Sequence, residues 1–226
     1  MILILLTAAA IAAWHLARHR RRTVRPGPGA SAAARARALR TPAVRAATAL
    51  GIPTQRAAQA YRYDAGAEGE RRTAARIDVL RAEGWTILHD RALPYGRANV
   101  DHLAISPRGL VILPDTKLWS SRYRLRIVGG RLLHGGWDVT GRLRGLRHEA
   151  ATVADALGTP VVPLVLMDGA PVEGGELHFD GIRIVPADQA VPVLRALART
   201  SGPLTHAHLT RRAHQVLPPY QEGHRR

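Results

Sequence analysis

Two acids and one lysine in the stretch from Asn99 to Lys117, NVDHLAISPRGLVILPDTK, have residue types and a spacing suited to chemistry. Asp101 and Asp115 lie at the far ends of two apolar runs, and Lys117 follows two positions later. Lys117 is the only lysine, since every other residue in the Lys+Arg count of 33 is an arginine. An ammonium is a compact charge with a tunable proton affinity, whereas a guanidinium stays charged. This lysine therefore indicates proton or point-charge chemistry, with chance survival on a solvated strand end as the alternative.

The segment Ser106-Pro107-Arg108-Gly109 predicts a hairpin that brings these residues together. Proline suits the second position of a type I turn, and the glycine that follows can adopt the left-handed conformation that closes the loop. Pairing Ser106 with Leu110 then places Asp101 opposite Asp115, with Lys117 on the same face. Two facing carboxylates repel each other unless a cation lies between them, so a divalent metal with oxygen ligands is the expected partner.

Other residues near these acids qualify this geometry. Pro114 has no backbone donor, so the ladder must be open or bulged next to Asp115, and the pairing could slip by one residue. His102 points to the face opposite Asp101, which favours a packing role over a ligand role. The histidines at 206, 208 and 214 lie on an arginine-rich amphipathic segment and are interpreted as surface residues rather than a metal site.

A helix before the hairpin is expected to supply a third acid. Apolar residues at 74, 77 and 80 predict a helix over 68–82, ended by Gly84. Glu70 lies on the buried side near the start of this helix, where a carboxylate is unusual. The alternative is an acid that simply complements the positive helix N-terminus.

The remaining apolar patterns predict an α/β fold. Strands are expected over 85–89, 100–105, 110–115, 122–128, 131–133, 161–167 and 181–185, and helices over 143–157, 187–200 and 206–216. The strand over 161–167 is entirely apolar and should be buried, whereas 181–185 should lie at an edge. This order of elements predicts a mixed β-sheet flanked by helices.

Composition limits the classes of partner. A formal net charge of +16 and a pI near 11.6 favour a polyanion, either nucleic acid or an anionic lipid surface. The absence of cysteine excludes disulfides, zinc-thiolate sites and a cysteine nucleophile. With one Phe and few aromatic residues overall, a base-stacking platform is not expected.

The N-terminal part of the chain predicts a membrane anchor and a basic linker. Residues 1–17 form an apolar run that RHRRR follows at once, so the positive-inside rule places the rest of the chain in the cytoplasm. A cleaved signal is the alternative, and a helix packed on the domain is less favoured. Residues 18–63 contain eleven arginines and no acid, which predicts a linker that lies on lipid, gathers nucleic acid or is simply solvated.

Within this linker, the sequence predicts an Ala/Arg helix that is interrupted near Pro42. We expect the folded domain to occupy residues 64–216 and a basic tail to occupy residues 217–226, of which the last six, QEGHRR, should be mobile.

The run Gly66-x-x-Gly69-Glu70, followed by NVDHLAISPRGLVILPDTK and Trp119, resembles the nuclease-related domain (NERD) family of the PD-(D/E)xK nuclease superfamily. The resemblance covers roughly residues 66–167 and implies a restriction-endonuclease-like core. It implies that Asp101 and Asp115 hold one or two Mg²⁺ (or Mn²⁺) ions and that Glu70 completes or supports the metal shell. Lys117 would orient the attacking water or steady the phosphate charge, and the Thr116 carbonyl could add a ligand.

The resemblance and the charge together predict a Mg²⁺-dependent nuclease that hydrolyses phosphodiester bonds of nucleic acid, with DNA favoured. The anchor would make it a single-pass protein of the cell membrane with a cytoplasmic nuclease domain. Related domains often carry a Gln in the helix after the core hairpins, where this chain offers Arg147, His148 and Glu149. A catalytically decayed, membrane-anchored nucleic-acid-binding module is therefore the alternative, and a structural membrane protein a third. Nothing in the sequence indicates the oligomeric state.

Overall fold

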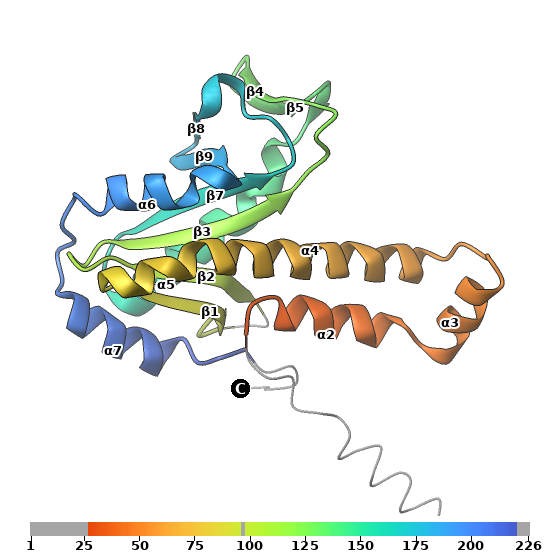
Figure 1. Cartoon of the computed structure of the whole chain (residues 1–226), viewed down its shortest axis with the longest axis horizontal. Coiled ribbons are helices and arrows are strands. Elements are labelled where there is room, and N and C mark those ends of the chain that lie inside the picture. The colour runs from red at the N-terminus through yellow and green to blue at the C-terminus, as the bar shows by residue number, and fades with distance from the viewer. Residues whose placement is uncertain (1–26, 96–97, 221–226) are drawn as a thin grey trace, which may run out of the picture.

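A mixed β-sheet forms the centre of the computed structural model, which describes residues 27–95 and 98–220 (Figure 1). The six strands lie in the order β1-β2-β3-β7-β9-β8, where β3, β7 and β9 are parallel and the other neighbours antiparallel. Their bounds are Thr86–Ala92 for β1, Asn99–Ile105 for β2, Val111–Leu118 for β3, Val161–Asp168 for β7, Ile182–Pro186 for β9 and Leu177–Phe179 for β8. The predicted α/β fold with a mixed sheet flanked by helices is confirmed.

Helices cover both faces of this sheet because its central strands are apolar on both sides. On one face, Ile112 of β3 packs in a core with residues of α4, the 3₁₀ segment η1 and α6. On the other, Leu113 packs in a core with residues of α5 and α7. The bounds are Gln55–Ile77 for α4, Asp78–Glu83 for η1, Arg144–Leu157 for α5, Ala190–Leu197 for α6 and His206–Val216 for α7.

A second, three-stranded sheet stands beside the end of β3 (Figure 1). Its strands are β4 (Leu125–Val128), β5 (Arg131–His134) and β6 (Trp137–Asp138). Leu125 and Leu132 are buried in the core shared with α5 and α7, so this small sheet is packed against the main body.

Two predictions at the far side of the main sheet were wrong in detail. The strand expected at an edge, β9, instead lies between β7 and β8. The edge strand β8 has only three residues, too few to show a pattern, and a turn with positive φ at Asp180 and Gly181 joins it to β9. The helix expected over 187–200 consists of the short segment η4 (Ala187–Gln189) followed by α6, which ends at Leu197.

The segment that the sequence assigns to a basic linker is mostly helical over its described residues, 27–63. It contains α2 (Ala30–Leu39), α3 (Pro42–Ala49) and the start of α4, which begins at Gln55 rather than near residue 68. The predicted break near Pro42 is present, and Thr41 caps the helix that follows it. Helix α2 lies alongside α4 and buries small side chains, namely Ser31, Ala32, Ala34 and Ala36. Alanines give no strong apolar signal, although they allow helices to approach closely.

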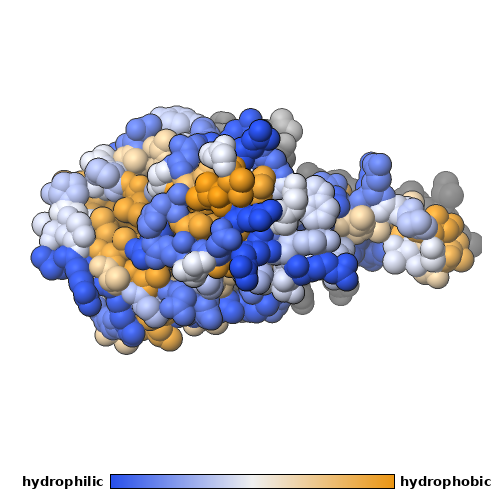
Figure 2. All heavy atoms as spheres, turned by 90° about the horizontal axis from the view of Figure 1, so that it is seen from above, coloured by the Kyte–Doolittle hydropathy of each residue, from blue (hydrophilic) through white to orange (hydrophobic). Residues whose placement is uncertain are grey.

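Helix α3 and the N-terminal end of α4 extend away from the body as a narrow projection (Figures 1 and 2). Within residues 27–95 and 98–220, no helix is both long enough and apolar enough to cross a bilayer. The apolar run at 1–17 lies outside the described residues.

The start of the expected C-terminal tail is attached to the domain. The backbone N–H groups of Ala92 and Tyr220 donate to the carbonyls of Pro218 and Asp90, each at 2.8 Å, and Leu217 is buried. The chain therefore continues past α7 along the edge strand β1. Residues 221–226 lie outside the described part.

Candidate active site

The hairpin of β2 and β3 has the predicted turn and register. Gly109 has a φ of 77°, and the N–H of Ser106 donates to the carbonyl of Leu110 at 2.9 Å. The paired residues are Ala104 with Ile112 and Ile105 with Val111, which is the predicted register.

The ladder between β2 and β3 ends at Ile112, two residues before Pro114. Strand β3 instead pairs with β7 along all its residues, from Val111 to Leu118. The opening expected at Pro114 is therefore confirmed. The observed register, extended along both strands, would pair Asp101 with Asp115. The strands separate before these residues, so the two acids do not form a ladder pair.

Lys117 forms an ion pair with Asp115, two residues earlier on the same face of β3. Its Nζ lies 2.7 Å from one carboxylate oxygen and donates a hydrogen bond to the other at 3.0 Å. Burial lowers the pKa of Lys117, but attraction to Asp115, and then to Asp101 and Glu149, outweighs burial and raises this pKa. The ammonium is therefore held in its charged form beside a buried carboxylate.

Asp101 and Glu149 approach this pair from β2 and α5. Loss of water and the charges of Asp115 and Glu149 raise the pKa of Asp101 to about 7. Burial and the charge of Asp115 raise the pKa of Glu149 to about 7 as well. Glu149 thus belongs to the acid cluster, and it is one of the residues that the sequence shows where related domains often carry Gln.

Glu70 reaches the same cluster from α4. Its side chain is buried, its Oε2 has no hydrogen-bond partner, and burial followed by the charges of Asp101 and Asp90 raises its pKa to about 9. The hydroxyl of Thr116 donates to that of Thr73 at 2.7 Å, which fixes α4 against β3. The predicted side chains at 70, 101, 115 and 117 therefore lie in one cluster, together with Glu149.

Comparison with protein families agrees with this geometry. The model described as "Nuclease-related domain" matches residues 65–166, which include Glu70, Asp101, Asp115, Lys117 and Glu149. Residues 65–166 of this chain are therefore similar to the nuclease-related domain family. Neither a search of curated proteins nor a search of solved structures gave a match.

Within the matched residues, Asp90 is a cluster member that the sequence does not reveal. It is fully buried with a φ of 48°, and the register of β1 and β2 places it opposite Asp101. It accepts a hydrogen bond from the N–H of Ser31 at 2.8 Å and another from the side chain of Asn99 at 3.0 Å. Burial raises its pKa despite these bonds. An acid at the end of a predicted strand is the only local signal.

Helix α2, outside the family match, also borders the cluster. Arg35 of this helix donates to the side-chain oxygen of Asn99 at 3.1 Å, and its guanidinium lies 5.7 Å from the ring centre of Tyr220. Burial lowers the pKa of Arg35, but Tyr220 and the acid Asp101 raise it overall. Because the sequence assigns this segment to a linker, it does not indicate Arg35 as a residue near the site.

The histidines do not join the acids. His102 is buried, and its Nδ1 lies 2.8 Å from Nδ1 of His89, whose Nε2 lies 3.1 Å from Asp78. Burial and the neighbouring His89 lower the pKa of His102 to about 3. His206 hydrogen-bonds Thr86 at 3.0 Å, and the histidines at 208 and 214 are exposed.

The acid cluster fits a divalent metal in its chemistry, although its side chains are not arranged around one. Among residues 27–95 and 98–220, no three acidic or histidine side chains are close enough together to hold an ion. The donors are nevertheless hard carboxylate oxygens that repel one another, and one oxygen of Glu70 is buried without a partner. Binding an ion would require these side chains to turn toward it.

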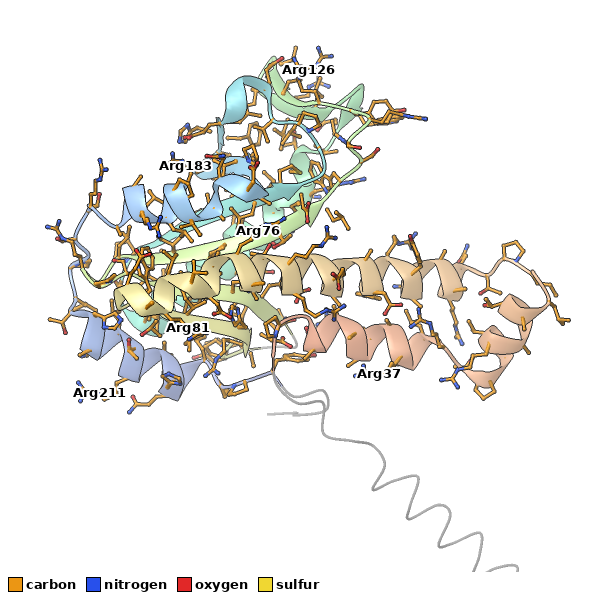
Figure 3. All side chains as sticks on the ribbon, viewed as in Figure 1. Arg37, Arg76, Arg81, Arg126, Arg183 and Arg211 are labelled. Carbon is orange, nitrogen blue, oxygen red and sulfur yellow. The ribbon has the colours of Figure 1, made fainter. Side chains whose placement is uncertain are left out.

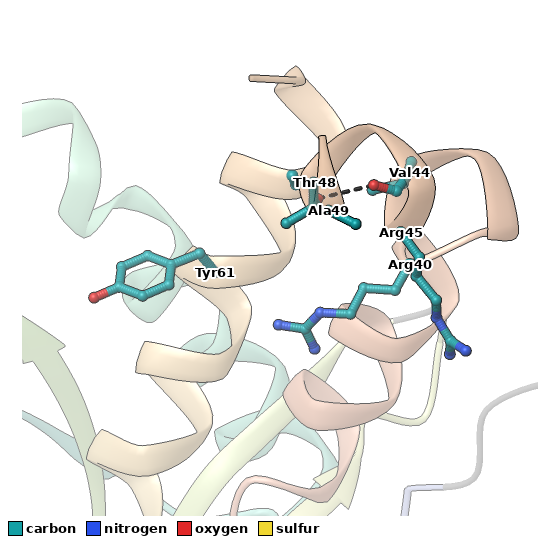
Figure 4. Close-up of a pocket in the computed structure, with 7 residues that line it drawn as sticks. Arg40, Val44, Arg45, Thr48, Ala49 and Tyr61 are labelled. Carbon is teal, nitrogen blue, oxygen red and sulfur yellow. Dashed lines mark hydrogen bonds between the residues drawn. The ribbon is translucent and has the colours of Figure 1, made fainter. Parts of the chain in front are cut away.

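A pocket of about 510 Å³ lies elsewhere, between α3 and α4 (Figure 4). Arg40, Arg45 and Tyr61 line it, and the hydroxyl of Thr48 donates to the carbonyl of Val44 at 2.8 Å. Tyr61 and Glu70 are nine residues apart on α4, which is about 14 Å along the helix axis. This pocket is therefore not part of the candidate active site.

Proposed function

We propose that the nuclease-related domain hydrolyses phosphodiester bonds of nucleic acid, with DNA as the favoured substrate and Mg²⁺ or Mn²⁺ as the cofactor. One observation supports this most strongly. Mutually repelling carboxyls from α4, β2, β3 and α5 meet the only lysine of the chain where β2 and β3 separate. Such a cluster suits a cation that in turn attracts phosphate.

In this proposal, Asp101 and Asp115 hold the metal ion and Glu70 completes the set of ligands. A bound divalent ion supplies charge neutralisation at the phosphate and makes water a better nucleophile. Lys117 stays charged because its ammonium contacts both oxygens of Asp115. It would therefore act on the phosphate through its positive charge. Glu149 extends the carboxylate cluster from α5, and its charge also attracts Lys117.

Membrane attachment is a separate part of the proposal. The apolar run at 1–17 and the basic residues after it support a single-pass anchor with the nuclease-related domain in the cytoplasm. Membrane fractionation of the full chain, compared with a variant lacking residues 1–17, tests this part. Recovery of both proteins in the soluble fraction would contradict it.

The activity is tested with the full chain, purified in detergent, acting on supercoiled plasmid. We expect nicking with Mg²⁺ or Mn²⁺, none in chelator, and none by a Lys117→Ala variant. Arg199→Ala is the matched control, because Arg199 is an exposed cation away from the cluster. Equal nicking by the wild type and by Lys117→Ala would remove Lys117 from the mechanism.

A second candidate is a decayed nuclease that only binds nucleic acid. The ion pair between Lys117 and Asp115, together with a glutamate where related domains often have Gln, favours this alternative. It predicts salt-dependent DNA binding by the wild type with no metal-dependent nicking at any pH.

A further inference from the structure

Four aromatic rings form a continuous row from Trp119, just after β3, to Trp137 in strand β6 of the small sheet. Successive ring centres lie 5.4 Å apart from Trp119 to His134, 5.7 Å from His134 to Tyr123, and 4.8 Å from Tyr123 to Trp137. The row begins two residues after Lys117, and it ends at Trp137, which is 59% exposed. It therefore leads outward from the candidate active site to a large exposed indole.

The middle of this row is fixed by packing. A Cβ on Gly135, whose φ is 62°, would lie 2.9 Å from the ring of Tyr123, so the backbone is pressed against that ring. The ring nitrogen Nε2 of His134 hydrogen-bonds the carbonyl of Ser120 at 3.0 Å. The backbone N–H of Trp119 donates to the carbonyl of Asp168 at 3.0 Å. These contacts restrain the rings of Tyr123 and His134 and the backbone at Trp119.

The same region is strongly basic. Residues 119–148 contain seven arginines and one acid, Asp138. The guanidinium of Arg142 lies 5.4 Å from the ring centre of Trp119, and Arg126 points outward from the tip of the small sheet (Figure 3). Within the described residues, none of the exposed arginines of this region forms an ion pair with a carboxylate; these are Arg122, Arg124, Arg126, Arg131, Arg142 and Arg144.

We infer that Trp137, at the exposed end of the aromatic row, and the arginines of this region bind a single-stranded stretch of nucleic acid and position it toward Lys117, while the buried His134 supports the row from behind. The inference rests on the proposed function only for the position of the phosphate that is cut. Aromatic faces stack on bases that are unpaired, whereas bases inside a duplex already stack on each other. Arginines without carboxylate partners are free to bind the phosphates between those bases.

This inference differs from the expectation, based on composition, that the chain has no base-stacking platform. The aromatic residues are few, but two of the four tryptophans and a tyrosine gather in this one row. Composition counts residues and cannot show that residues 119, 123 and 137 lie together.

The test measures binding of the full chain to a labelled oligothymidine and to a duplex of the same length, in chelator so that no cleavage occurs. We expect Trp137→Ala to weaken binding of the single strand about tenfold, the effect of losing one stacked base. Binding of the duplex should change less than twofold. Tyr95→Ala is the control, because Tyr95 is 85% exposed and its ring makes no contact with the rings of the row.

Arg142→Ala tests the phosphate contacts, with Arg199→Ala as its control. We expect Arg142→Ala to reduce the slope of log affinity against log salt by about 0.7, the value for one contact to a single strand.

Thermal melting should confirm that Trp137→Ala is folded, because an exposed side chain contributes little to the core. Unchanged binding of oligothymidine by Trp137→Ala, or an equal loss in Tyr95→Ala, would overturn the inference.

Cleavage with Mg²⁺ is scored separately, so that the two ideas can fail independently. Nicking by the wild type together with unchanged binding by Trp137→Ala rejects the aromatic row and leaves the nuclease proposal standing. Trp137-dependent binding without nicking rejects the nuclease proposal and supports the row.

Discussion

The two faces of strands β1 and β2 carry different kinds of buried polar group, hydrogen-bonded histidines on one face and mutually repelling acids on the other. On the face toward η1, His89 and His102 are paired across the strands and hydrogen-bond each other at 2.8 Å. One position further along each ladder, Asp90 and Asp101 share a register position, and both have a raised pKa. The histidines hydrogen-bond each other, with only Nε2 of His102 left buried without a partner, whereas the acids repel each other and Glu70.

This difference separates a structural polar cluster from one suited to binding. A buried polar cluster whose members hydrogen-bond one another, with no like charges in it, stabilises the fold and needs no ligand. A cluster of like charges lowers the stability of the folded protein unless a cation neutralises it. The comparison predicts that changes among the acids cost activity and can increase stability, while changes among the histidines cost stability.

The largest expected effect is on activity and comes from Lys117→Arg. This change keeps the charge but replaces a compact ammonium by a broad planar fork in a partly buried site. We expect nicking to fall by about 100-fold or more, while the melting temperature changes little. Full activity in Lys117→Arg would show that only charge matters there and that lysine has no special role.

The second prediction concerns stability and pH. The pKa of Glu70 is raised to about 9 in the folded protein from an ordinary 4.5, so the folded state holds this proton more tightly than the unfolded chain. Stability should therefore fall as pH rises from about 4.5 to about 9. Glu70→Gln removes this loss, and we expect it to stabilise the protein by about 1 to 3 kcal/mol at pH 8 in chelator.

Urea unfolding at pH 5 and pH 8 measures this effect. Glu68→Gln is the control, because Glu68 is an exposed carboxylate on the same helix and should give no comparable gain. A Glu70→Gln variant less stable than the wild type at pH 8 would show that the Glu70 carboxylate is not a source of repulsion.

The third prediction tests the other side of the comparison. His89→Ala removes the partner of His102 and a contact to Asp78, and leaves a buried ring nitrogen unpaired. We expect a loss of about 1 to 3 kcal/mol in unfolding free energy, with metal affinity unchanged. Loss of metal binding in a variant that remains folded would connect the two faces, against this account.

The smallest expected effect concerns the docking of α2. Arg35→Ala removes the hydrogen bond to Asn99 and the contact with Tyr220, and we expect it to cost about 1 kcal/mol. Hydrogen exchange should become faster in α2 and at Asp90, which α2 contacts through Ser31. Arg37→Ala is the control, since Arg37 is exposed on the same helix. Equal exchange in both variants would mean that Arg35 does not hold α2 in place.

Local chemistry explains what the sequence could predict. Pro107 and Gly109 determine the turn, and the turn determines the register that places Asp101 and Asp115. Pro114 has no donor, so the opening beside Asp115 could also be predicted. The position of 161–167 inside the sheet follows from its apolar composition and is seen in the pairing of β7 with strands on both sides, although its first three residues are only partly buried.

Contacts between distant segments explain which features could not be predicted from the sequence. The conformation of Asp90 depends on a hydrogen bond from Ser31, which is 59 residues away. Helix α2 packs through alanines, which give no strong apolar pattern. Glu149 joins the cluster only because α5 crosses the face of the sheet next to Asp115.

Calorimetric titration of Mn²⁺ into the full chain at pH 7 tests the central claim most directly. We expect the wild type to bind the ion and to release protons as it binds, because Asp101 and Glu70 hold protons there that the ion displaces. Proton release is measured by repeating the titration in buffers of different ionisation enthalpy, and Asp115→Asn should abolish binding. Absence of binding by the wild type, or equal binding by Asp115→Asn, would contradict the account.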